Sequence, residues 1–320
     1  MISSKKILIT GGAGFIGSNM ANLLSENNEI TVLDDFSGGT LKNLEESKVG
    51  KSIKVIRGDI TKRDFFFKLE KDFDLVVHLA ANSDVRSGSE DTEIDMQTNV
   101  IGTHNVLEFM RRSDIKQLLF SSTSTVYGEV DMIPTPENYG PELPISLYGA
   151  SKLANEGYIW SYYHYYNIRP LIYRFANVVG RNSTHGVIHD FVIKLQKNPS
   201  ELEILGDGTQ EKSYIHVDDC INAMLHVYEN STKGDVVNLG NDQRTSVKTI
   251  AQAVCSEMGL KDVNFKYTGG SDGRGWKGDI KIAQLATEKI RKYGYVNRLD
   301  SDESVALAVK EIYAQMKSYL

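Results

Sequence analysis

Cysteine is scarce in this 320-residue sequence, and long apolar runs and an excess of positive charge are missing. The two cysteines, Cys220 and Cys255, lie far apart, which argues against a disulfide framework or a metal site and favours a reducing compartment. No apolar stretch approaches the roughly 18 residues of a transmembrane helix, and no signal-like core opens the chain. We therefore expect a cytoplasmic protein with no membrane partner. Lys and Arg number 36 against 42 Asp and Glu, a net charge of -6, which argues against nucleic acid as a partner.

Short β-branched runs alternate with longer helical patterns over the first 120 residues, which predicts βαβ units and a parallel sheet. The runs are apolar throughout instead of alternating, as expected when helices cover both faces of the sheet. The sequence predicts strands at 7–9, 29–33, 54–56, 75–79, 117–120 and 171–175, and long helices at 91–112 and 146–167. The expected fold is α/β, a doubly wound Rossmann sheet.

After about Val179 the predicted strands become fewer, and turns rich in glycine and aspartate become more frequent. This change predicts a division into residues 1–178, the Rossmann domain, and a smaller α/β domain at 179–320. We expect residues 213–245 to return to the first sheet. A glycine-rich loop covers 269–278, and a final amphipathic helix is expected at 302–316.

A glycine-rich segment, residues 10–17, follows the first strand and opens the first helix. Glycine there allows a tight turn and close approach of the backbone to a pyrophosphate, which the helix N-terminus then binds. Asp34 ends the second strand, where an acid bonds the ribose hydroxyls of a dinucleotide and repels a 2′-phosphate. Asp35 follows it in place of an arginine, so the pattern predicts NAD as cofactor and not NADP.

Tyr148 and Lys152 are spaced to share one helix face. An ammonium beside a phenol favours the phenolate and lowers its pKa, so this tyrosine could take a proton from a sugar hydroxyl. An ordinary exposed pair is the alternative, since the chain holds 16 tyrosines. The hydroxyl cluster at 121–128 follows a predicted strand and should face the same crevice, although several of its members could serve only as turn or cap residues.

These motifs together resemble the extended short-chain dehydrogenase/reductase family. The resemblance rests on residues 10–17, Asp34, 78–81, 121–128, Tyr148 with Lys152, 173–178, 214–219 and 278–279, and so covers nearly the whole chain. It implies an enzyme in which Tyr148, Lys152 and Thr123 are catalytic. It also implies that the first domain binds NAD and that the second binds a nucleotide sugar, with no metal.

The subgroup is indicated by the hydroxyl cluster. Related 4,6-dehydratases carry an adjacent Asp-Glu pair there, and related decarboxylases a Glu, whereas this chain has Ser124 and Thr125. The remaining groups resemble those of UDP-glucose 4-epimerases. This resemblance implies transient removal of hydride from C4 of a UDP-hexose and its return to the opposite face. Alternatives are an epimerase of a uronate or dTDP-linked sugar, a nucleotide-sugar dehydrogenase or reductase, and a non-enzymatic NAD-sensing protein.

The same resemblance assigns individual positions. For the cofactor they are Gly11, Gly14, Phe15, Ile16, Gly17, Asp34, Asp35, Phe36, Ser37, Asp59, Ile60, Leu79, Ala80, Ala81, Asn99, Ser121, Tyr148, Lys152 and Phe175. For the substrate they are Ser83, Thr123, Asn177, Val187, Lys212, Arg274 and Asp279. Lys212 stands where the family more often has arginine, which weakens a bidentate phosphate contact.

Two further expectations concern specificity and assembly. Ala283 aligns with a position where a bulky residue excludes N-acetyl sugars, so its small side chain implies that UDP-GlcNAc and UDP-GalNAc are also accepted. The helices at 91–112 and 146–167 resemble the pair that forms the four-helix interface of the family, which implies a homodimer. Their Met, Tyr and Trp content suits such a contact and equally suits core packing within one subunit.

Overall fold

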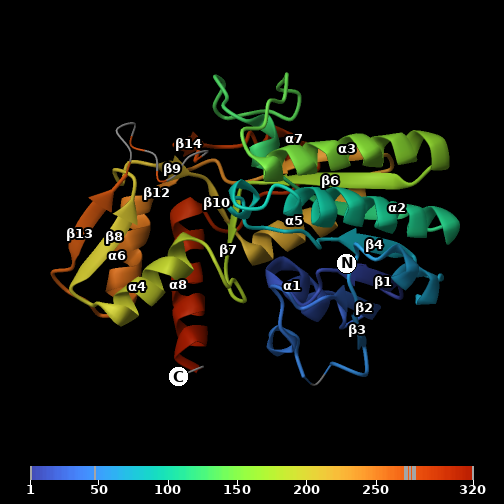
Figure 1. Ribbon diagram of the computed structural model, residues 1–320, viewed down its shortest axis with the longest axis horizontal. Coiled ribbons are helices and arrows are strands. Elements are labelled where there is room, and N and C mark those ends of the chain that lie inside the picture. Colours follow the sequence, from blue (N-terminus) through green and yellow to red (C-terminus); the bar gives the residue numbers. More distant parts are fainter. Residues whose placement is uncertain (1, 47, 270–272, 274, 276–278, 319–320) are drawn as a thin grey trace.

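The sheet of the first half of the molecule is parallel and seven-stranded, with the strand order β3-β2-β1-β4-β5-β6-β11 (Figure 1). A computed structural model of the chain describes residues 2–46, 48–269, 273, 275 and 279–318. In sheet order the strands are β3 (Ile53–Arg57), β2 (Glu29–Asp34), β1 (Lys6–Thr10), β4 (Leu75–His78), β5 (Gln117–Thr123), β6 (Arg169–Phe175) and β11 (Asp235–Leu239). The order reverses between β1 and β4, so the predicted doubly wound sheet is confirmed.

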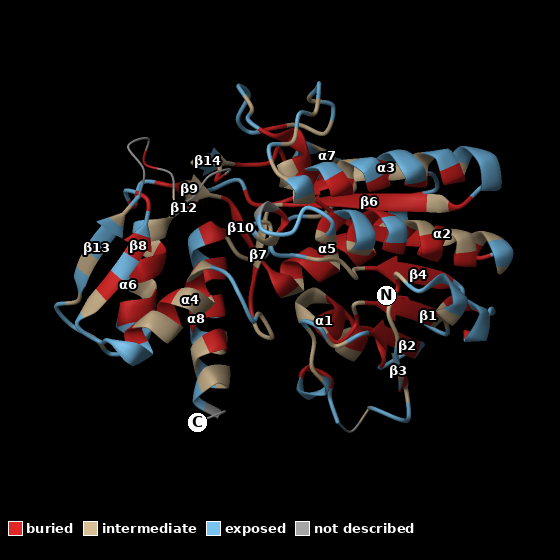
Figure 2. Cartoon of the chain, in the orientation of Figure 1, coloured by how far each residue is buried: buried red, intermediate tan, exposed pale blue. Residues whose placement is uncertain are grey.

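Helices cover both faces of this sheet. On one face α1 (Phe15–Leu24) and α5 (Val217–Asn230) share a core with Ile7 and Ile9 of β1. On the other face α2 (Gly102–Arg112) and α3 (Leu147–Tyr166) pack with Leu8. Successive strand side chains point to opposite faces and both faces are buried, which explains the uninterrupted apolar strands (Figure 2).

The two long helices differ in how well their limits match the prediction. The first was predicted from residue 91, but regular helix begins near 94 and passes through a π-helical turn, η4 (Met96–Ile101), into α2. The Asp91 carboxylate accepts the Glu93 amide proton at 2.9 Å, and this local turn competes with a helix start. The second agrees closely: Ser146 caps the Gly149 amide at 3.1 Å, and Asn167 ends α3 with a left-handed backbone.

The second half has its own core, formed between helices α4 (Val187–Lys197), α6 (Val247–Glu257) and α8 (Ser301–Ser318). Strands β8 (Glu201–Leu205) and β13 (Asn264–Thr268) pair beside them. A small sheet joins β12 (Thr245–Ser246), β9 (Glu211–Lys212) and β14 (Ile282–Ala283). Strands β7 (Asn177–Val179) and β10 (Tyr214–His216) pair with each other. The shorter helices are η1 (Leu41–Asn43), η2 (Arg63–Lys68), η3 (Ser87–Ser89), η5 (Ser124–Tyr127) and α7 (Glu288–Lys292).

The division of the chain after residue 178 stays a prediction. Strand β11, from the segment 213–245, pairs with β6 at the edge of the large sheet, and α5 packs on that sheet. Among the described residues no helix is long and apolar enough to cross a membrane. The same residues contain no group of three or more His, Cys, Asp or Glu side chains that could hold a metal ion.

Candidate active site

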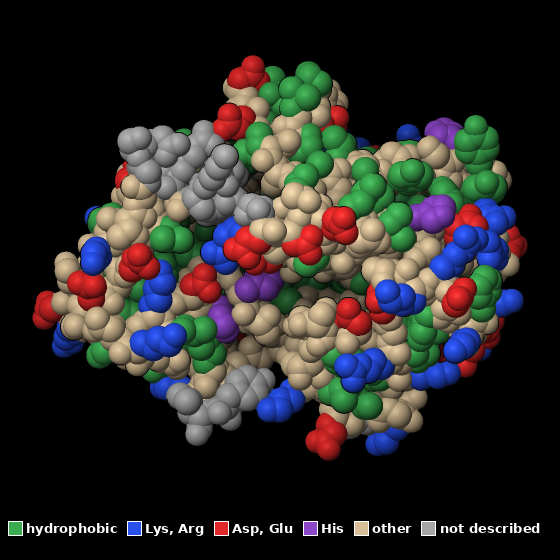
Figure 3. All heavy atoms as spheres, in the orientation of Figure 1, with side chains coloured by type: hydrophobic (Ala, Val, Ile, Leu, Met, Phe, Trp, Pro, Cys, Tyr) green, Lys and Arg blue, Asp and Glu red, His purple; other side chains and the backbone are tan. Residues whose placement is uncertain are grey.

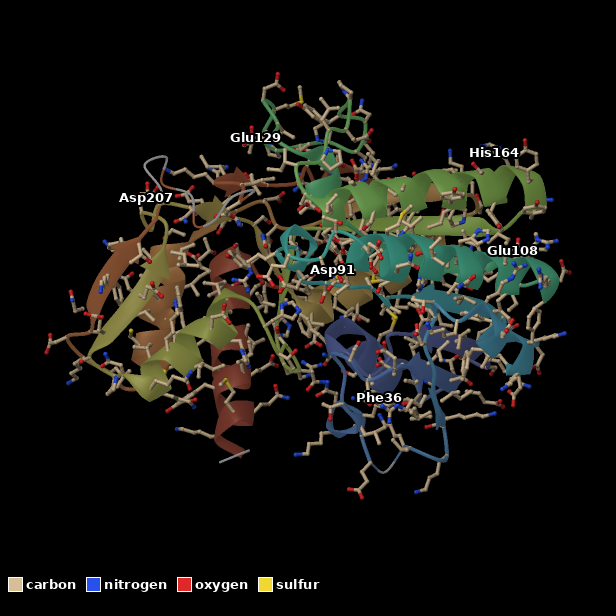
Figure 4. All side chains as sticks on the ribbon, viewed as in Figure 1. Phe36, Asp91, Glu108, Glu129, His164 and Asp207 are labelled. Carbon is tan, nitrogen blue, oxygen red and sulfur yellow. The ribbon has the colours of Figure 1, made fainter. Side chains whose placement is uncertain are left out.

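A cavity of about 880 Å³ lies where the carboxyl ends of the central strands meet the second half of the molecule. Figure 3 shows a hollow in this region, with histidine side chains at its edge. The carboxyl edge of a doubly wound sheet, at the reversal of strand order, is where such folds bind ligands. Asp91, which lines the cavity, lies between the two halves of the molecule (Figure 4).

The glycine-rich loop forms one wall of the cavity and leaves no space for a side chain at Gly11 or Gly17. Gly11 has φ +69°, and a Cβ there would lie 2.7 Å from the Ala80 amide nitrogen. A Cβ on Gly17 would lie 2.2 Å from the Gly11 carbonyl oxygen. Glycine therefore allows the loop to pack against α1 and β4 while the N-terminus of α1 faces the cavity.

Asp34 lies at the end of β2 beside this loop and is 7% exposed. Its Oδ2 accepts the Ala13 amide proton at 2.9 Å, and its Oδ1 accepts that of Phe36 at 2.8 Å. Burial raises the pKa of the Asp34 carboxyl, and the backbone donors oppose that rise. A dinucleotide fits this wall, because the tight glycine loop, the helix N-terminus and the carboxylate occur together as the adenosine half requires.

The groups predicted to be catalytic form another part of the cavity wall, here called the catalytic wall. Lys152 is 2% exposed, donates to the Ser121 carbonyl oxygen at 2.9 Å, and has its Nζ 5.9 Å from the centre of the Tyr148 ring. Thr123, the last residue of β5, interacts with the Tyr148 phenol and lowers its pKa. All three side chains line the cavity, so helix α3 and strand β5 bring together a phenol, a lysine and a hydroxyl.

The protonation of this pair differs from the sequence-based expectation. The pKa of Tyr148 is raised, first by burial and second by the negative charge of Asp95, while the bond with Thr123 opposes the rise. Burial lowers the pKa of Lys152 to about 8. Lys152 lies under the ring and donates to a carbonyl instead of the phenol oxygen, so the expected fall in the Tyr148 pKa is not found in the protein alone.

Most of the positions assigned to the cofactor line the cavity, with two exceptions. Phe36 lies beyond Asp34 with its ring 5.9 Å from the Arg57 guanidinium (Figure 4). Asn99 is buried behind the catalytic wall, where it donates to Ser151 Oγ at 2.9 Å. It supports the wall from behind. The cofactor positions that do line the cavity are Gly11, Gly14, Phe15, Ile16, Gly17, Asp34, Asp35, Ser37, Asp59, Ile60, Leu79, Ala80, Ala81, Ser121, Tyr148, Lys152 and Phe175.

The substrate positions are divided in the same way. Besides Thr123, those on the cavity wall are Ser83, Asn177, Val187 and Lys212. Asp279 is 5% exposed and accepts from Lys212 Nζ at 2.7 Å, just behind that wall. Arg274 lies outside the described residues. Ala283 follows on β14, paired with Lys212, and is not part of the cavity wall.

Two features of the site were not foreseen. The loop between β7 and α4 contributes Ser183, Thr184 and His185 to the cavity, and His185 Nε2 lies 3.3 Å from Ser83 Oγ across it. The polar run at residues 181–185 was the available signal in the sequence. The second is His78, which is buried between Thr10 Oγ1 at 2.7 Å and Thr103 Oγ1 at 2.9 Å. Burial lowers the His78 pKa to about 3, so the ring is neutral. Its two hydrogen bonds connect β4 with β1 and α2.

Comparison with known proteins agrees with this geometry. The sequence profile described as the NAD dependent epimerase/dehydratase family matches residues 7–240. The chain belongs to this family. A relative from Methanocaldococcus jannaschii, provisionally named a UDP-glucose 4-epimerase, is 37% identical over 310 residues, which are 95% of this chain and 97% of the relative.

Solved structures of family members are similar over almost the full length. A structure named UDP-galactose 4-epimerase is 34% identical with a TM-score of 0.87, covering 97% of this chain and 99% of that one. A Thermus thermophilus UDP-glucose 4-epimerase, solved in complex with NAD, is 28% identical with a TM-score of 0.83, covering 96% and 98%. The predictions of the family, of an enzyme of the epimerase type and of NAD as cofactor are confirmed. The individual site residues stay predictions.

Proposed function

We propose that this enzyme interconverts the C4 epimers of a UDP-hexose, UDP-glucose and UDP-galactose, with tightly held NAD. The observation that carries the proposal is the meeting of Tyr148, Lys152 and Thr123 on one wall of a cavity whose other wall fits a dinucleotide. The names of the relatives and structural neighbours support the same reaction.

Each residue has a distinct task in this reaction. Tyr148 takes the proton from the sugar 4-hydroxyl and later returns it. Thr123 holds the same sugar oxygen through its hydroxyl, and Lys152 binds the nicotinamide ribose next to the phenol. When bound, NAD would supply a hydride acceptor and a positive ring charge. Burial and the charge of Asp95 raise the Tyr148 pKa, so a positive charge in the cavity would favour the phenolate.

The hydroxyl cluster favours epimerisation over dehydration. Elimination of water needs an acid and a base in addition to the tyrosine, and Ser124 and Thr125 line the cavity where the dehydratases carry carboxyl groups. Neither hydroxyl is acidic enough for that task near neutral pH. The chain therefore has the groups for oxidation and reduction at one carbon, without the groups for loss of the 6-hydroxyl.

The diphosphate and base are assigned to the second half. We propose that Asn177 and Lys212 contact the diphosphate and that Asp279 contacts the uridine ribose. In the protein alone Lys212 is paired with Asp279 at 2.7 Å, so these contacts require that ion pair to open or to be shared. The small side chain of Ala283 supports acceptance of N-acetyl sugars, and absence of turnover of UDP-GlcNAc in a parallel assay would count against that extension.

The test is to mix the purified protein with UDP-galactose, with and without added NAD, and to follow the sugar protons by NMR. Appearance of UDP-glucose without net NADH is the expected result. Steady accumulation of NADH would instead identify a dehydrogenase, and turnover confined to a uronate or dTDP-linked sugar would identify a different epimerase. No change in any of these sugars, with NAD present, would refute the proposal.

We also propose that the enzyme is a homodimer joined through η4, α2 and α3. These helices expose large apolar or aromatic side chains, including Met96 at 54%, Tyr158 at 50% and Tyr165 at 80%. Side chains of this kind gathered on neighbouring helices are typical of a protein contact. A monomer mass in solution at micromolar concentration would contradict this assembly.

A further inference from the structure

A buried carboxylate, Asp95, lies behind the catalytic wall and has no task in the reaction described above. Asp95 is 1% exposed, and its Oδ1 accepts from Asn82 Nδ2 at 2.9 Å and from Asn99 Nδ2 at 3.1 Å. Its Oδ2 is buried and has no hydrogen-bond partner within the described part of the chain. Burial of a half-satisfied carboxylate opposes folding unless an opposite charge lies near it.

Hydrogen bonds connect Asp95 to the helix that carries the catalytic pair. Asn99, bonded to Asp95, donates to Ser151 Oγ at 2.9 Å, and Ser151 donates to the Tyr148 carbonyl oxygen at 2.7 Å. Lys152, the next residue of α3, is buried with its Nζ on a neutral carbonyl. Asp95 and Lys152 are thus two buried groups of opposite charge, and Asp95 is connected through Asn99 to Ser151, the residue next to Lys152.

We propose that Asp95 is a positioning residue, which holds the first turn of α3 in place through Asn99 and Ser151 and whose buried negative charge keeps Lys152 protonated. This inference rests on the proposed function and deepens it. Lys152 must stay charged to hold its ligand and to favour the phenolate of Tyr148, and a buried ammonium stays charged more readily when a negative charge lies in the same buried region.

The charges around the pair agree with this assignment. Burial lowers the pKa of Lys152 to about 8, and the carboxylates of Asp95 and Glu156 oppose that fall. Glu156 already forms an ion pair with the Arg174 guanidinium at 2.6 Å, which neutralises much of its charge. The charge of Asp95 is therefore the more effective of the two on Lys152. His78, which also interacts with Lys152, is neutral because its pKa is lowered to about 3.

The pKa of the Asp95 carboxyl depends on burial and on the groups around it. Burial raises the pKa of the Asp95 carboxyl, the amides of Asn82 and Asn99 and the charge of Lys152 oppose the rise, and Asp84 adds to it. The oxygen without a partner lies against the backbone of Gly88, where a Cβ would come within 2.6 Å. A longer acid does not fit there, so the test must remove the charge without adding volume.

The variant for the test is Asp95→Asn, which keeps the shape and one acceptor oxygen, with Glu90→Gln as the matched control. Glu90 is exposed and does not line the cavity. The first readout is NMR titration of isotope-labelled lysine, with the Lys152 signal assigned as the one lost in Lys152→Met. The second is the pH profile of UDP-galactose turnover in the holoenzyme.

Removal of a negative charge lowers the pKa of both Lys152 and Tyr148. We therefore expect the Lys152 titration midpoint and the turnover profile of Asp95→Asn to move to lower pH by about half a unit or more, and those of Glu90→Gln to stay in place. A Lys152 midpoint that is unmoved or raised in Asp95→Asn would overturn the proposal even if turnover falls, because a purely structural role predicts that result.

Two further outcomes keep the inference separate from folding and from the proposed function. If Asp95→Asn does not fold, the lysine titration is carried out on Asp95→Ser and on the parent protein. A Lys152 that is already uncharged at neutral pH in the parent would refute the proposal. If the parent turns over no UDP-hexose, the proposed function fails, while the lysine titration still decides the role of Asp95.

Discussion

Replacement of Tyr148 by phenylalanine removes one oxygen atom from the wall of the cavity and leaves the ring in place. That oxygen interacts with Thr123, which opposes the rise of its pKa, and it is the group that we expect to move the sugar proton. Loss of a positioned acid-base group costs about 10²- to 10⁴-fold in turnover, which corresponds to roughly 3–5 kcal/mol of barrier.

The effect of Tyr148→Phe on folding should be small. One neutral hydrogen bond contributes about 1 kcal/mol to stability, and loss of that amount lowers the melting temperature by about 2 °C in a chain of this size. The assay is turnover of UDP-galactose together with UDP affinity and the melting temperature. Tyr267→Phe, on β13, 43% exposed and away from the cavity, is the control. Near-normal turnover, or a loss matched by a large fall in melting temperature, would refute the assigned role.

Three other predictions follow from the same geometry. Gly17→Ala should destabilise the fold by about 1–3 kcal/mol and weaken NAD retention, because its Cβ would meet the Gly11 carbonyl oxygen. Gly157→Ala is the control and should have neither effect, because its Cβ would meet nothing within 4 Å. Thermal melts and bound-NAD content measure the two effects. Asp34→Asn should raise the affinity for NADP relative to NAD by at least about tenfold, and an unchanged ratio in a binding titration would contradict the role of Asp34. His78 is neutral when folded, with a pKa lowered to about 3 from 6.5, so its contribution to stability is full above pH 6.5 and is lost as the pH falls toward 3. His78→Gln should flatten the acid side of the stability profile by as much as ~1.4 kcal/mol per pH unit, and parallel profiles in denaturant titrations would show that His78 does not titrate as described.

The parts of the site that lie close together in sequence were predictable. The glycine loop, Asp34 and the pair Tyr148 and Lys152 each follow from one strand-helix junction or one helix face, where spacing fixes geometry. The strands of the sheet were predictable for the same reason, since both of its faces are buried and the apolar runs are continuous. The confirmed family adds to this, because it fixes the order in which these local motifs occur.

Contacts between distant segments were not predictable. Asp95 is coupled to Lys152 only because η4 packs against α3, and no local pattern distinguishes it from the exposed acids nearby. The pKa of Tyr148 was predicted to fall because spacing showed the lysine but not the depth of burial or the carboxylate behind it. The start of the first long helix was misplaced because a side-chain turn at Asp91 competes with helix formation.

The measurement that most directly tests the central claim is epimerisation of UDP-galactose in deuterium oxide, with the product C4 position examined by NMR. If a hydride leaves C4 and returns to it without exchange with solvent, the product keeps its original hydrogen at C4. Deuterium at C4 of the product would mean that a proton is exchanged with solvent at that carbon, and the account built on Tyr148 and NAD would then be wrong.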